Sequence, residues 1–229
     1  MKKIALIVAG GSGTRMGGQV PKQYLPIGGL PILMRTLRVF HEYDSNIKII
    51  LVLPLSDFDY WDTLCQTHNF TISHSLVAGG ASRFQSVKNG LQSIPGDAGL
   101  VAIHDGVRPF VAKEVIRMSF EEAERAGSAI AVIPLKDSIR KVGEYGKSYY
   151  QERHHFRLVQ TPQTFALPKI KQAYQSAEKS YFTDDATVYE EQGWQVTLIQ
   201  GNLDNIKITT PDDLEFSTFI LERKKFTDP

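Results

Sequence analysis

The sequence predicts an α/β fold, in which helices flank a mostly parallel β-sheet and a β-hairpin arm protrudes from the sheet. Two observations support this prediction. Apolar runs the length of a buried strand alternate with stretches of helical spacing over the first 135 residues, which is the pattern of βαβ units. The alternation stops after Leu135, where the polar segment 136–158 follows. We therefore expect a Rossmann-like sheet with an arm attached to it.

Four short, mostly apolar runs are expected to form strands, because continuous apolar runs of this length are typical of strands buried on both faces. They are residues 4–9, 47–53, 100–104 and 129–133, and residues 71–77 are expected to form a further strand, the third along the chain. The four segments between them are expected to be helices, because apolar residues recur there every three or four positions or a capping residue opens the segment. These segments start near Pro31, Ser56, Phe84 and Lys113 and end near Phe40, His68, Ile94 and Ala126.

The segment 136–158 contains KDSIRKV and all but the last residue of SYYQERHHFRLV, two stretches that can form strands on either side of a turn near Gly143 and Gly146. A structureless loop of this length is uncommon inside a compact domain, which favours a hairpin that leaves the sheet. Beyond it, helical patterns return at residues 168–179, 184–192 and 211–224, with short strands at 195–199 and 206–209. We expect one domain over residues 1–229 that includes this arm.

Composition excludes several classes of protein. The 26 Lys and Arg residues against 25 Asp and Glu leave a net charge of +1, without the basic excess of a general nucleic-acid binder. The single cysteine, Cys65, cannot form an internal disulfide. The apolar run near the N-terminus is too short for an export signal, and no run approaches the roughly 18 residues of a membrane span. We expect a soluble cytoplasmic protein that binds neither nucleic acid nor membrane.

A glycine-rich segment, AGGSGTRMG at residues 9–17, follows the first strand. Glycines at such a place let the backbone approach a ligand and present N–H groups to phosphates. The segment lacks the spacing of a P-loop, and the third position of the dinucleotide fingerprint falls on Met16. Arg15 and Lys22 add two cations at the carboxyl end of the strand, where parallel sheets bind their ligands. Two cations beside a glycine loop suit a triphosphate.

This loop and the PKQYLPIGGLPIL that follows it resemble those of nucleotidyltransferases that join a nucleoside triphosphate to a phosphorylated sugar or alcohol. Five further motifs appear in order, namely GGASRFQSV at 79–87, HDGVRP at 104–109, TPQTF at 161–165, TDDA at 183–186 and DNIKIT at 204–209. Together they resemble the 2-C-methyl-D-erythritol 4-phosphate cytidylyltransferases of non-mevalonate isoprenoid biosynthesis. Because the resemblance spans nearly the whole chain, it is highly specific.

The resemblance implies that the chain transfers a cytidylyl group from CTP to 2-C-methyl-D-erythritol 4-phosphate, releasing pyrophosphate and forming 4-diphosphocytidyl-2-C-methyl-D-erythritol. It implies a nucleotide pocket made by Ala9, Gly10, Gly11, Gly79, Gly80 and Ser86. It implies catalytic roles for four cations, Arg15, Lys22, Arg153 and Lys207. It also implies that the alcohol phosphate is bound with the help of Asp105, Arg108, Ser138, Thr161 and Thr183, and that Asp105 can hold a metal ion.

The chemistry of this reaction agrees with the residues present. A phosphate monoester is largely ionised at neutral pH, since its second pKa is near 6, so the reaction needs no general base. It does need positive charge and positioning, and each cation–anion contact at ~4 Å contributes on the order of 4 kcal/mol before desolvation. Mg²⁺ is the expected cofactor, because it binds through one or two carboxylates together with substrate phosphates.

Three histidines are interpreted as lying outside the chemistry. His104, at the end of a buried strand, is expected to be a hydrogen-bonded core residue. His154 and His155 are a tempting metal-binding pair, but they fall in an expected strand, where adjacent side chains point to opposite faces. We therefore expect that this pair holds no metal.

The chain departs from the family pattern at three places. Val8-Ala9-Gly10-Gly11 stands where relatives often have Pro-Ala-Ala-Gly, and Ser138 stands where they often have threonine. The first change preserves the backbone chemistry and the second preserves the hydroxyl group. Ala81 replaces an acidic residue of some relatives, which puts any contact to the nucleotide at this position in doubt.

Three alternative functions remain. A ribitol 5-phosphate cytidylyltransferase shares the glycine loop and the TPQTF segment, but Gly106 and the TDDA stretch favour methylerythritol phosphate as the acceptor. The broken glycine fingerprint and the charge of Lys22 argue against a dinucleotide-dependent oxidoreductase. A catalytically silent nucleotide-binding regulator is disfavoured because the expected catalytic cations are all present.

The expected arm indicates that the chain assembles with a second copy of itself. A two-stranded hairpin alone is marginal in water, so we expect it to pack on another copy of the chain. The resemblance implies the same homodimer with arm exchange, in which Arg153 enters the neighbour's active site.

Overall fold

The computed structural model describes residues 1–10 and 20–227, with side chains described as far as Arg223. In this part of the chain seven strands form one sheet, in the order β11-β7-β10-β6-β1-β4-β5. They are β1 (Lys3–Val8), β4 (Lys48–Leu53), β5 (Ser75–Ala78), β6 (Leu100–Asp105), β7 (Ser128–Pro134), β10 (Arg157–Ala166) and β11 (Leu198–Gln200). Only β10 runs antiparallel to its neighbours among these described strands, so the predicted α/β fold with a mostly parallel sheet is confirmed.

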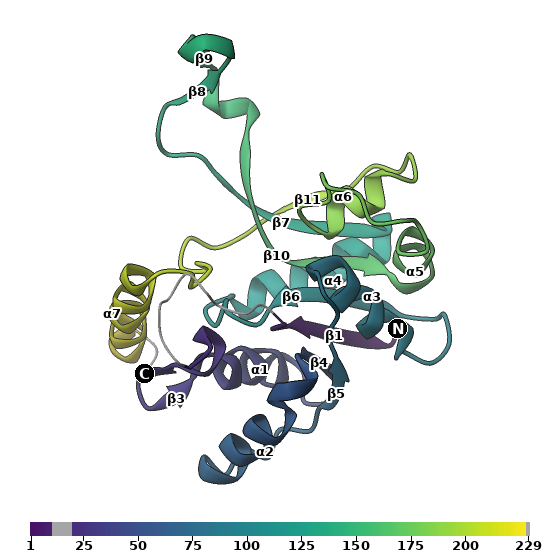
Figure 1. Cartoon of the computed structure of the whole chain (residues 1–229), viewed down its shortest axis with the longest axis vertical. Helices are drawn as coiled ribbons and strands as arrows, with labels where there is room; N and C mark the ends of the chain where they lie inside the picture. The colour runs from purple at the N-terminus through teal and green to yellow at the C-terminus, as the bar shows by residue number, and fades with distance from the viewer. Residues whose placement is uncertain (11–19, 228–229) are drawn as a thin grey trace.

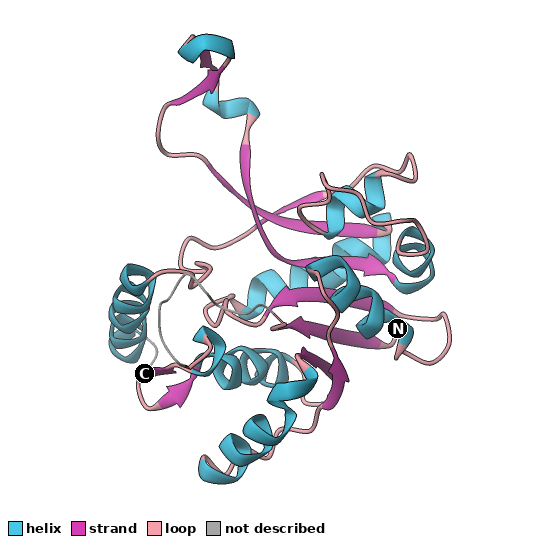
Figure 2. Ribbon diagram, viewed as in Figure 1, coloured by secondary structure: helices cyan, strands magenta, loops and turns pink. Residues whose placement is uncertain are grey.

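Helices cover both faces of the sheet (Figures 1 and 2). One face packs against α1 (Ile32–Tyr43), α2 (Phe58–Thr67) and α4 (Lys113–Ala126). The other packs against α3 (Arg83–Gln92), α5 (Leu167–Ala173) and α6 (Asp185–Glu190). Alternation along β1 explains the two layers, because Ala5 and Ile7 belong to the first core and Ile4 and Leu6 to the second. None of the described helices is long and apolar enough to cross a membrane.

A third apolar cluster closes one end of the molecule. Here α7 (Pro211–Thr227) packs on the short pair β2 (Pro26–Ile27) and β3 (Leu30–Pro31). Ile220 of α7 and Ile208 before it are buried with Val107 and Phe110, which follow β6. The C-terminal helix therefore supports the loop at the carboxyl end of β6, where the sequence places the HDGVRP motif.

The strand β10 was not predicted beyond Leu158, because the residues in the middle of it are polar. Gln160, Thr161, Gln163 and Thr164 are all buried, and a register shift interrupts the pairing with β7 between Val159 and Gln163. Polar residues without apolar alternation give no strand signal. The predicted strand at 71–77 shortens to β5, and none of the described strands covers the predicted 206–209.

The predicted hairpin arm is present. Its strands β8 (Ile139–Val142) and β9 (Ser148–Gln151) pair antiparallel, from Ile139 with Gln151 to Val142 with Ser148. Figure 1 shows the arm standing clear of the sheet. Val142, Tyr149 and Tyr150 on its strands are exposed within this chain, and Tyr145 in the turn is 96% exposed. The predicted second strand of the arm is confirmed at Ser148–Gln151 and is wrong at residues 152–156, where the 3-10 turn Arg153–His155 interrupts it before β10 begins.

Candidate active site

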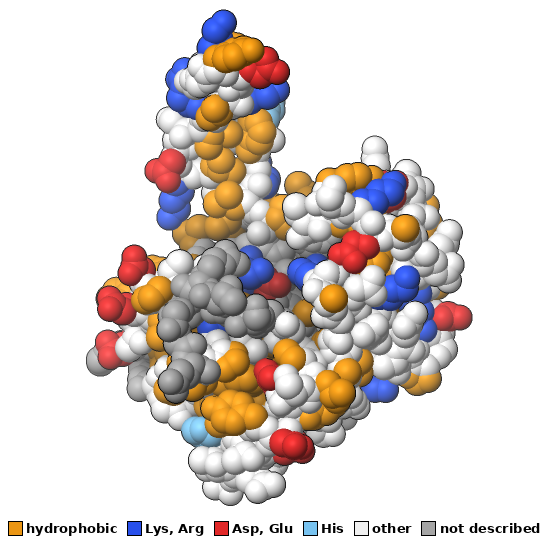
Figure 3. Space-filling model, in the orientation of Figure 1, with side chains coloured by type: hydrophobic (Ala, Val, Ile, Leu, Met, Phe, Trp, Pro, Cys, Tyr) orange, Lys and Arg blue, Asp and Glu red, His pale blue; other side chains and the backbone are white. Residues whose placement is uncertain are grey.

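A cavity of about 440 Å³ opens at the carboxyl ends of β1 and β6. Its described lining comes from the residues after these strands, from the start of α3 and from two separate lysines. These lining residues are Val8, Ala9, Gly10, Lys22, Gln23, Gly80, Ala81, Ser82, Arg83, Ser86, Asp105, Val107 and Lys207. Figure 3 shows basic and acidic side chains gathered near the centre of one face, below the arm. The cavity thus lies where the topology of a parallel sheet predicts a ligand.

One wall of the cavity is built around the hydroxyl of Ser86. Its Oγ accepts a hydrogen bond of 3.1 Å from the Gly80 N–H and donates one of 2.9 Å to the Ser82 carbonyl. A Cβ at Gly10 or Gly79 would lie 3.2 or 3.1 Å from this oxygen, so glycine lets both loops close on it. A Cβ at Gly80 would lie 2.4 Å from Gln85 Cβ, too close for any side chain. The structure therefore brings together four of the residues predicted to bind the nucleotide, and a fifth, Ala9, lines the same cavity.

Asp105 lies at the centre of the charged part of the cavity. Its Oδ2 accepts a 3.0 Å hydrogen bond from Arg108 Nε and lies 3.2 Å from Lys207 Nζ, while Oδ1 lies 3.9 Å from Arg83 Nε. Burial alone would raise the pKa of Asp105, but Lys207, Arg83 and Arg108 outweigh burial and hold this pKa well below its usual range. The carboxylate is therefore ionised, and the surrounding cations leave an excess of positive charge for an anionic ligand.

A hydrogen-bonded relay fixes the backbone of Asp105 from behind. Its N–H donates to Thr161 Oγ1 at 3.1 Å, and the Thr161 hydroxyl donates to His104 Nδ1 at 3.0 Å. His104 Nε2 must carry a proton, because its partner at 3.0 Å is the Arg108 carbonyl, which can only accept. Burial lowers the pKa of His104 to about 4, so the ring is neutral at neutral pH. The interpretation of His104 as a core residue is confirmed, and the Thr161 hydroxyl is engaged in the same relay.

Two charged residues of the site had no predicted role. Arg83 donates two hydrogen bonds, of 2.8 and 2.6 Å, to the fully buried carboxylate of Asp185, and the Tyr174 hydroxyl donates a third of 2.5 Å. Gln163 joins the same region, since its amide donates to Asp184 Oδ2 at 2.9 Å and accepts from the Ala186 N–H at 2.8 Å. Arg83, Gln163 and Asp185 belong to GGASRFQSV, TPQTF and TDDA, three motifs already identified in the sequence. Sequence spacing cannot show that Arg83 and Asp185, 102 positions apart, form a pair.

The remaining predicted residues are distributed as follows. Lys22 and Lys207 line the cavity, and Arg108 reaches from Asp105 to the Asn205 carbonyl at 2.8 Å, which anchors the DNIKIT segment. Thr183 is exposed just before α6. Ser138 and Arg153 belong to the arm and are not among the described lining residues of the cavity, and Arg153 donates to the Lys136 carbonyl. The predicted Gly11 and Arg15 lie outside the described residues.

His154 and His155 do not lie in a strand, so the premise that their side chains point to opposite faces is wrong. The two residues lie in a 3-10 turn, their ring centroids are 4.0 Å apart, and both Nε2 atoms lie 3.3 Å from Glu152 Oε2. A turn does not alternate its side chains between two faces as a strand does. These two side chains therefore point to the same carboxylate.

A family model described as 2-C-methyl-D-erythritol 4-phosphate cytidylyltransferase (IspD) matches residues 3–223 of the chain. Relatives of that name from Phocaeicola vulgatus and Bacteroides fragilis are 48% and 50% identical over 221 residues, which cover 96% of this chain and all of each relative. The crystal structure of 4-diphosphocytidyl-2C-methyl-D-erythritol synthase from Anaerococcus prevotii aligns with a TM-score of 0.84 at 28% identity, covering 97% of this chain and 96% of that one. The cytidylyltransferase structure from Thermus thermophilus aligns with a TM-score of 0.78 at 28% identity, covering 97% of this chain and all of that one.

Proposed function

Because this chain belongs to the 2-C-methyl-D-erythritol 4-phosphate cytidylyltransferase family, it transfers a cytidylyl group from CTP to 2-C-methyl-D-erythritol 4-phosphate, and we propose that the cavity around Asp105 is where the transfer takes place. The observation that carries this proposal is one ionised carboxylate surrounded by three cations at the carboxyl edge of the sheet. Two highly anionic substrates have to meet there, and only an excess of positive charge allows their approach.

The nucleotide occupies the side of the cavity formed by Ala9, Gly10, Gly80 and Ser86. Close packing of these residues leaves backbone groups, rather than side chains, to face the base and ribose. Lys22 lies beside them and stabilises the negative charge that develops at the α-phosphate, as Arg15 does in the same proposal. Pyrophosphate is the leaving group.

The phosphate of the acceptor occupies the other side, near Asp105, Lys207 and Thr183. This phosphate is the nucleophile and is already ionised near neutral pH, so positioning replaces proton abstraction. The neutral state of His104 and its engagement on both ring nitrogens support this assignment, because the ring has no position left from which to accept a proton from the substrate. Arg108 keeps Asp105 and the segment of Lys207 in place.

Asp105 is also the proposed ligand of Mg²⁺. Its ionised carboxylate is the kind of oxygen donor that Mg²⁺ prefers, and its Oδ1 lies 3.9 Å from Arg83 Nε, beyond hydrogen-bond distance. The ion would neutralise charge on the triphosphate and hold it in a reactive conformation. Among the described lining residues Asp105 is the one carboxylate, so substrate phosphates supply further ligands.

The enzyme is proposed to act as a homodimer in which each arm completes the neighbour's site. Ser138 precedes β8 and Arg153 follows β9, and Figure 1 shows this hairpin standing clear of the sheet. Both residues are therefore assigned to the neighbour's site in this proposal. The arm exposes Val142, Tyr145 and Tyr150, and a second subunit would bury these side chains. Arg153 then adds a cation at the acceptor phosphate.

A cytoplasmic location fits the half-buried Cys65, the free cysteine of the described chain.

Pyrophosphate release from each of the four nucleoside triphosphates tests the substrate assignment, with methylerythritol phosphate or ribitol phosphate as the acceptor. We expect the highest kcat/KM for CTP with methylerythritol phosphate. A preference for ribitol 5-phosphate would favour the alternative acceptor, and a preference for another triphosphate would contradict the cytidine pocket. The Lys22→Ala variant serves as the control for contaminating activity.

A further inference from the structure

The turn that follows β9 brings three metal-binding side chains together on the arm. Glu152 Oε2 lies 3.3 Å from His154 Nε2 and 3.3 Å from His155 Nε2, and the three donor atoms lie within 4.8 Å of one another. All three side chains are exposed within the single chain. Within the described residues this is the one group of three or more His, Cys, Asp or Glu side chains that converge in this way.

We infer that Glu152, His154 and His155 form a binding site for Zn²⁺ or a similar divalent transition metal. Two ligands of a tetrahedral zinc ion, each bound at about 2.0–2.1 Å, lie about 3.3–3.4 Å apart. The two distances from Glu152 to the imidazoles match this separation. The convergence of two imidazole nitrogens on one carboxylate oxygen at this separation is the arrangement that a shared ion requires.

The ligand chemistry separates this site from the magnesium proposed at Asp105. Two imidazoles and one carboxylate form a set that zinc uses in proteins, with a fourth position left for water. Mg²⁺ prefers oxygen ligands alone and binds imidazole poorly. An ion at Glu152 would also bind residues on both sides of Arg153, whose guanidinium donates to the Lys136 carbonyl across the base of the arm. The ion would hold this turn in one conformation.

Cobalt titration of the metal-free protein, prepared without a polyhistidine tag and without nucleotide, tests the site. Tetrahedral Co²⁺ absorbs strongly in the visible range, so it reports the coordination directly. We expect one equivalent per chain, displaced by Zn²⁺ and retained in excess Mg²⁺. The affinity should fall about 100-fold in the double variant His154→Ala/His155→Ala, which removes both imidazoles, and should also fall in Glu152→Gln, which removes the charged oxygen ligand.

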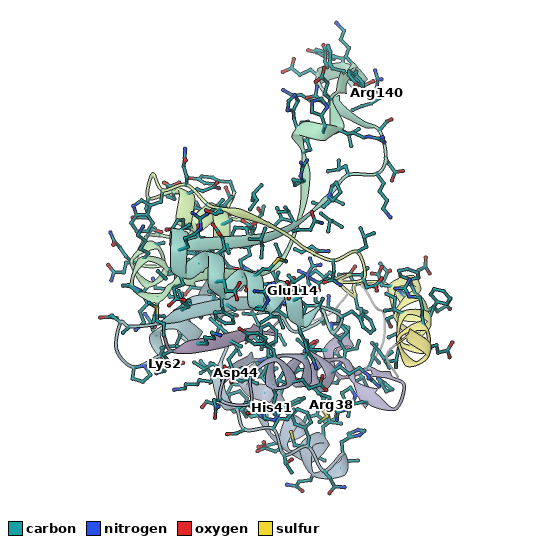
Figure 4. All side chains as sticks on the ribbon, turned by 180° about the vertical axis from the view of Figure 1, so that it is seen from behind. Lys2, Arg38, His41, Asp44, Glu114 and Arg140 are labelled. Carbon is teal, nitrogen blue, oxygen red and sulfur yellow. The ribbon has the colours of Figure 1, made fainter. Side chains whose placement is uncertain are left out.

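His41→Ala is the matched control, because Figure 4 shows His41 on the body of the molecule, far from the arm that Arg140 marks. This variant should bind Co²⁺ like the native protein. Zn²⁺ should also slow amide hydrogen exchange at residues 152–156 in the native protein and leave the double variant unchanged. Absence of the absorption, its persistence in the double variant, or its displacement by Mg²⁺ would overturn the inference. Circular dichroism confirms that the variants are folded, which their exposed positions lead us to expect.

Discussion

Replacing Asp185 with asparagine removes one negative charge from the buried network that joins α3 to α6. In the native protein this carboxylate accepts two hydrogen bonds from Arg83, of 2.8 and 2.6 Å, and one of 2.5 Å from Tyr174. The Asp185 side chain is fully buried, whereas 30% of the Arg83 side chain is exposed. Asparagine keeps the shape of aspartate, so the variant isolates the loss of the charge and of one acceptor oxygen.

Removing one partner of a buried ion pair costs about 3–5 kcal/mol, because the other charge stays behind without compensation. Water reaches part of Arg83 and reduces this penalty, so we expect Asp185→Asn to lower the free energy of unfolding by about 2–4 kcal/mol. Turnover should fall too. Arg83 Nε lies 3.9 Å from Asp105 Oδ1, and a guanidinium released from Asp185 can move onto the carboxylate at the centre of the site.

Urea unfolding of the native protein and the variant measures the loss, provided that the dependence on urea concentration is unchanged. Asp97→Asn is the matched control. Asp97 lies 3.3 Å from Lys171, but its side chain is 78% exposed, so its loss should cost less than about 1 kcal/mol. If Asp185→Asn costs no more than this control, the buried pair does not stabilise the site and the reasoning is refuted.

Three further predictions concern the chemistry of the site. Lys22→Ala should lower kcat about 10²–10³-fold with a smaller change in KM for CTP, because negative charge develops at the α-phosphate during transfer. Steady-state kinetics separate kcat from KM, and a raised KM with unchanged kcat would show that Lys22 only binds the substrate in the ground state. Excess EDTA should stop pyrophosphate release and Mg²⁺ should restore it, whereas full turnover in EDTA would contradict the magnesium proposal. Lowering the pH from about 7.5 to 5 should reduce the free energy of unfolding by about 2 kcal/mol through His104. The folded ring, with a pKa of about 4, stays neutral there, while the unfolded chain binds a proton near pH 6.5, so this stability is present above about pH 6.5 and is lost as the pH falls toward 4. Urea unfolding of His104→Gln, which cannot titrate, should show a pH dependence smaller by that amount, and equal pH dependence in both proteins would contradict a buried neutral ring.

Apolar periodicity predicted most of the fold because most strands are buried between two helical layers. The run at residues 4–9 became β1, and its alternate side chains divide between the two cores. Most of β10 was not predicted, because the side chains in its middle are polar although they are buried like those of the other strands. Gln160 donates to the Asn202 carbonyl, and Gln163 forms hydrogen bonds with Asp184 and Ala186. Partners distant in sequence thus satisfy the polar groups of a segment whose local sequence resembles a loop.

The candidate site divides in the same way. The rule that ligands bind at the carboxyl ends of parallel strands selected Lys22 from the sequence, and the family resemblance added Asp105. The pairing of Arg83 with Asp185 depends on how α6 packs beside α3, which no local pattern contains. The turn at His154 was missed because an alternating strand was assumed, whereas three residues of 3-10 helix reverse the conclusion about where its side chains point.

The claim that each active site is built from two subunits is tested most directly by mixing two inactive variants. Lys22→Ala damages the cavity and Arg153→Ala damages the arm, and reversible dissociation followed by random reassociation makes about half of the dimers mixed. If Arg153 acts in the neighbour's site, each mixed dimer has one doubly damaged site and one intact site. Activity should then recover to about a quarter of that of the native enzyme. If Arg153 acts in its own chain, every site keeps one lesion, and the absence of recovery in confirmed mixed dimers would contradict the shared active site.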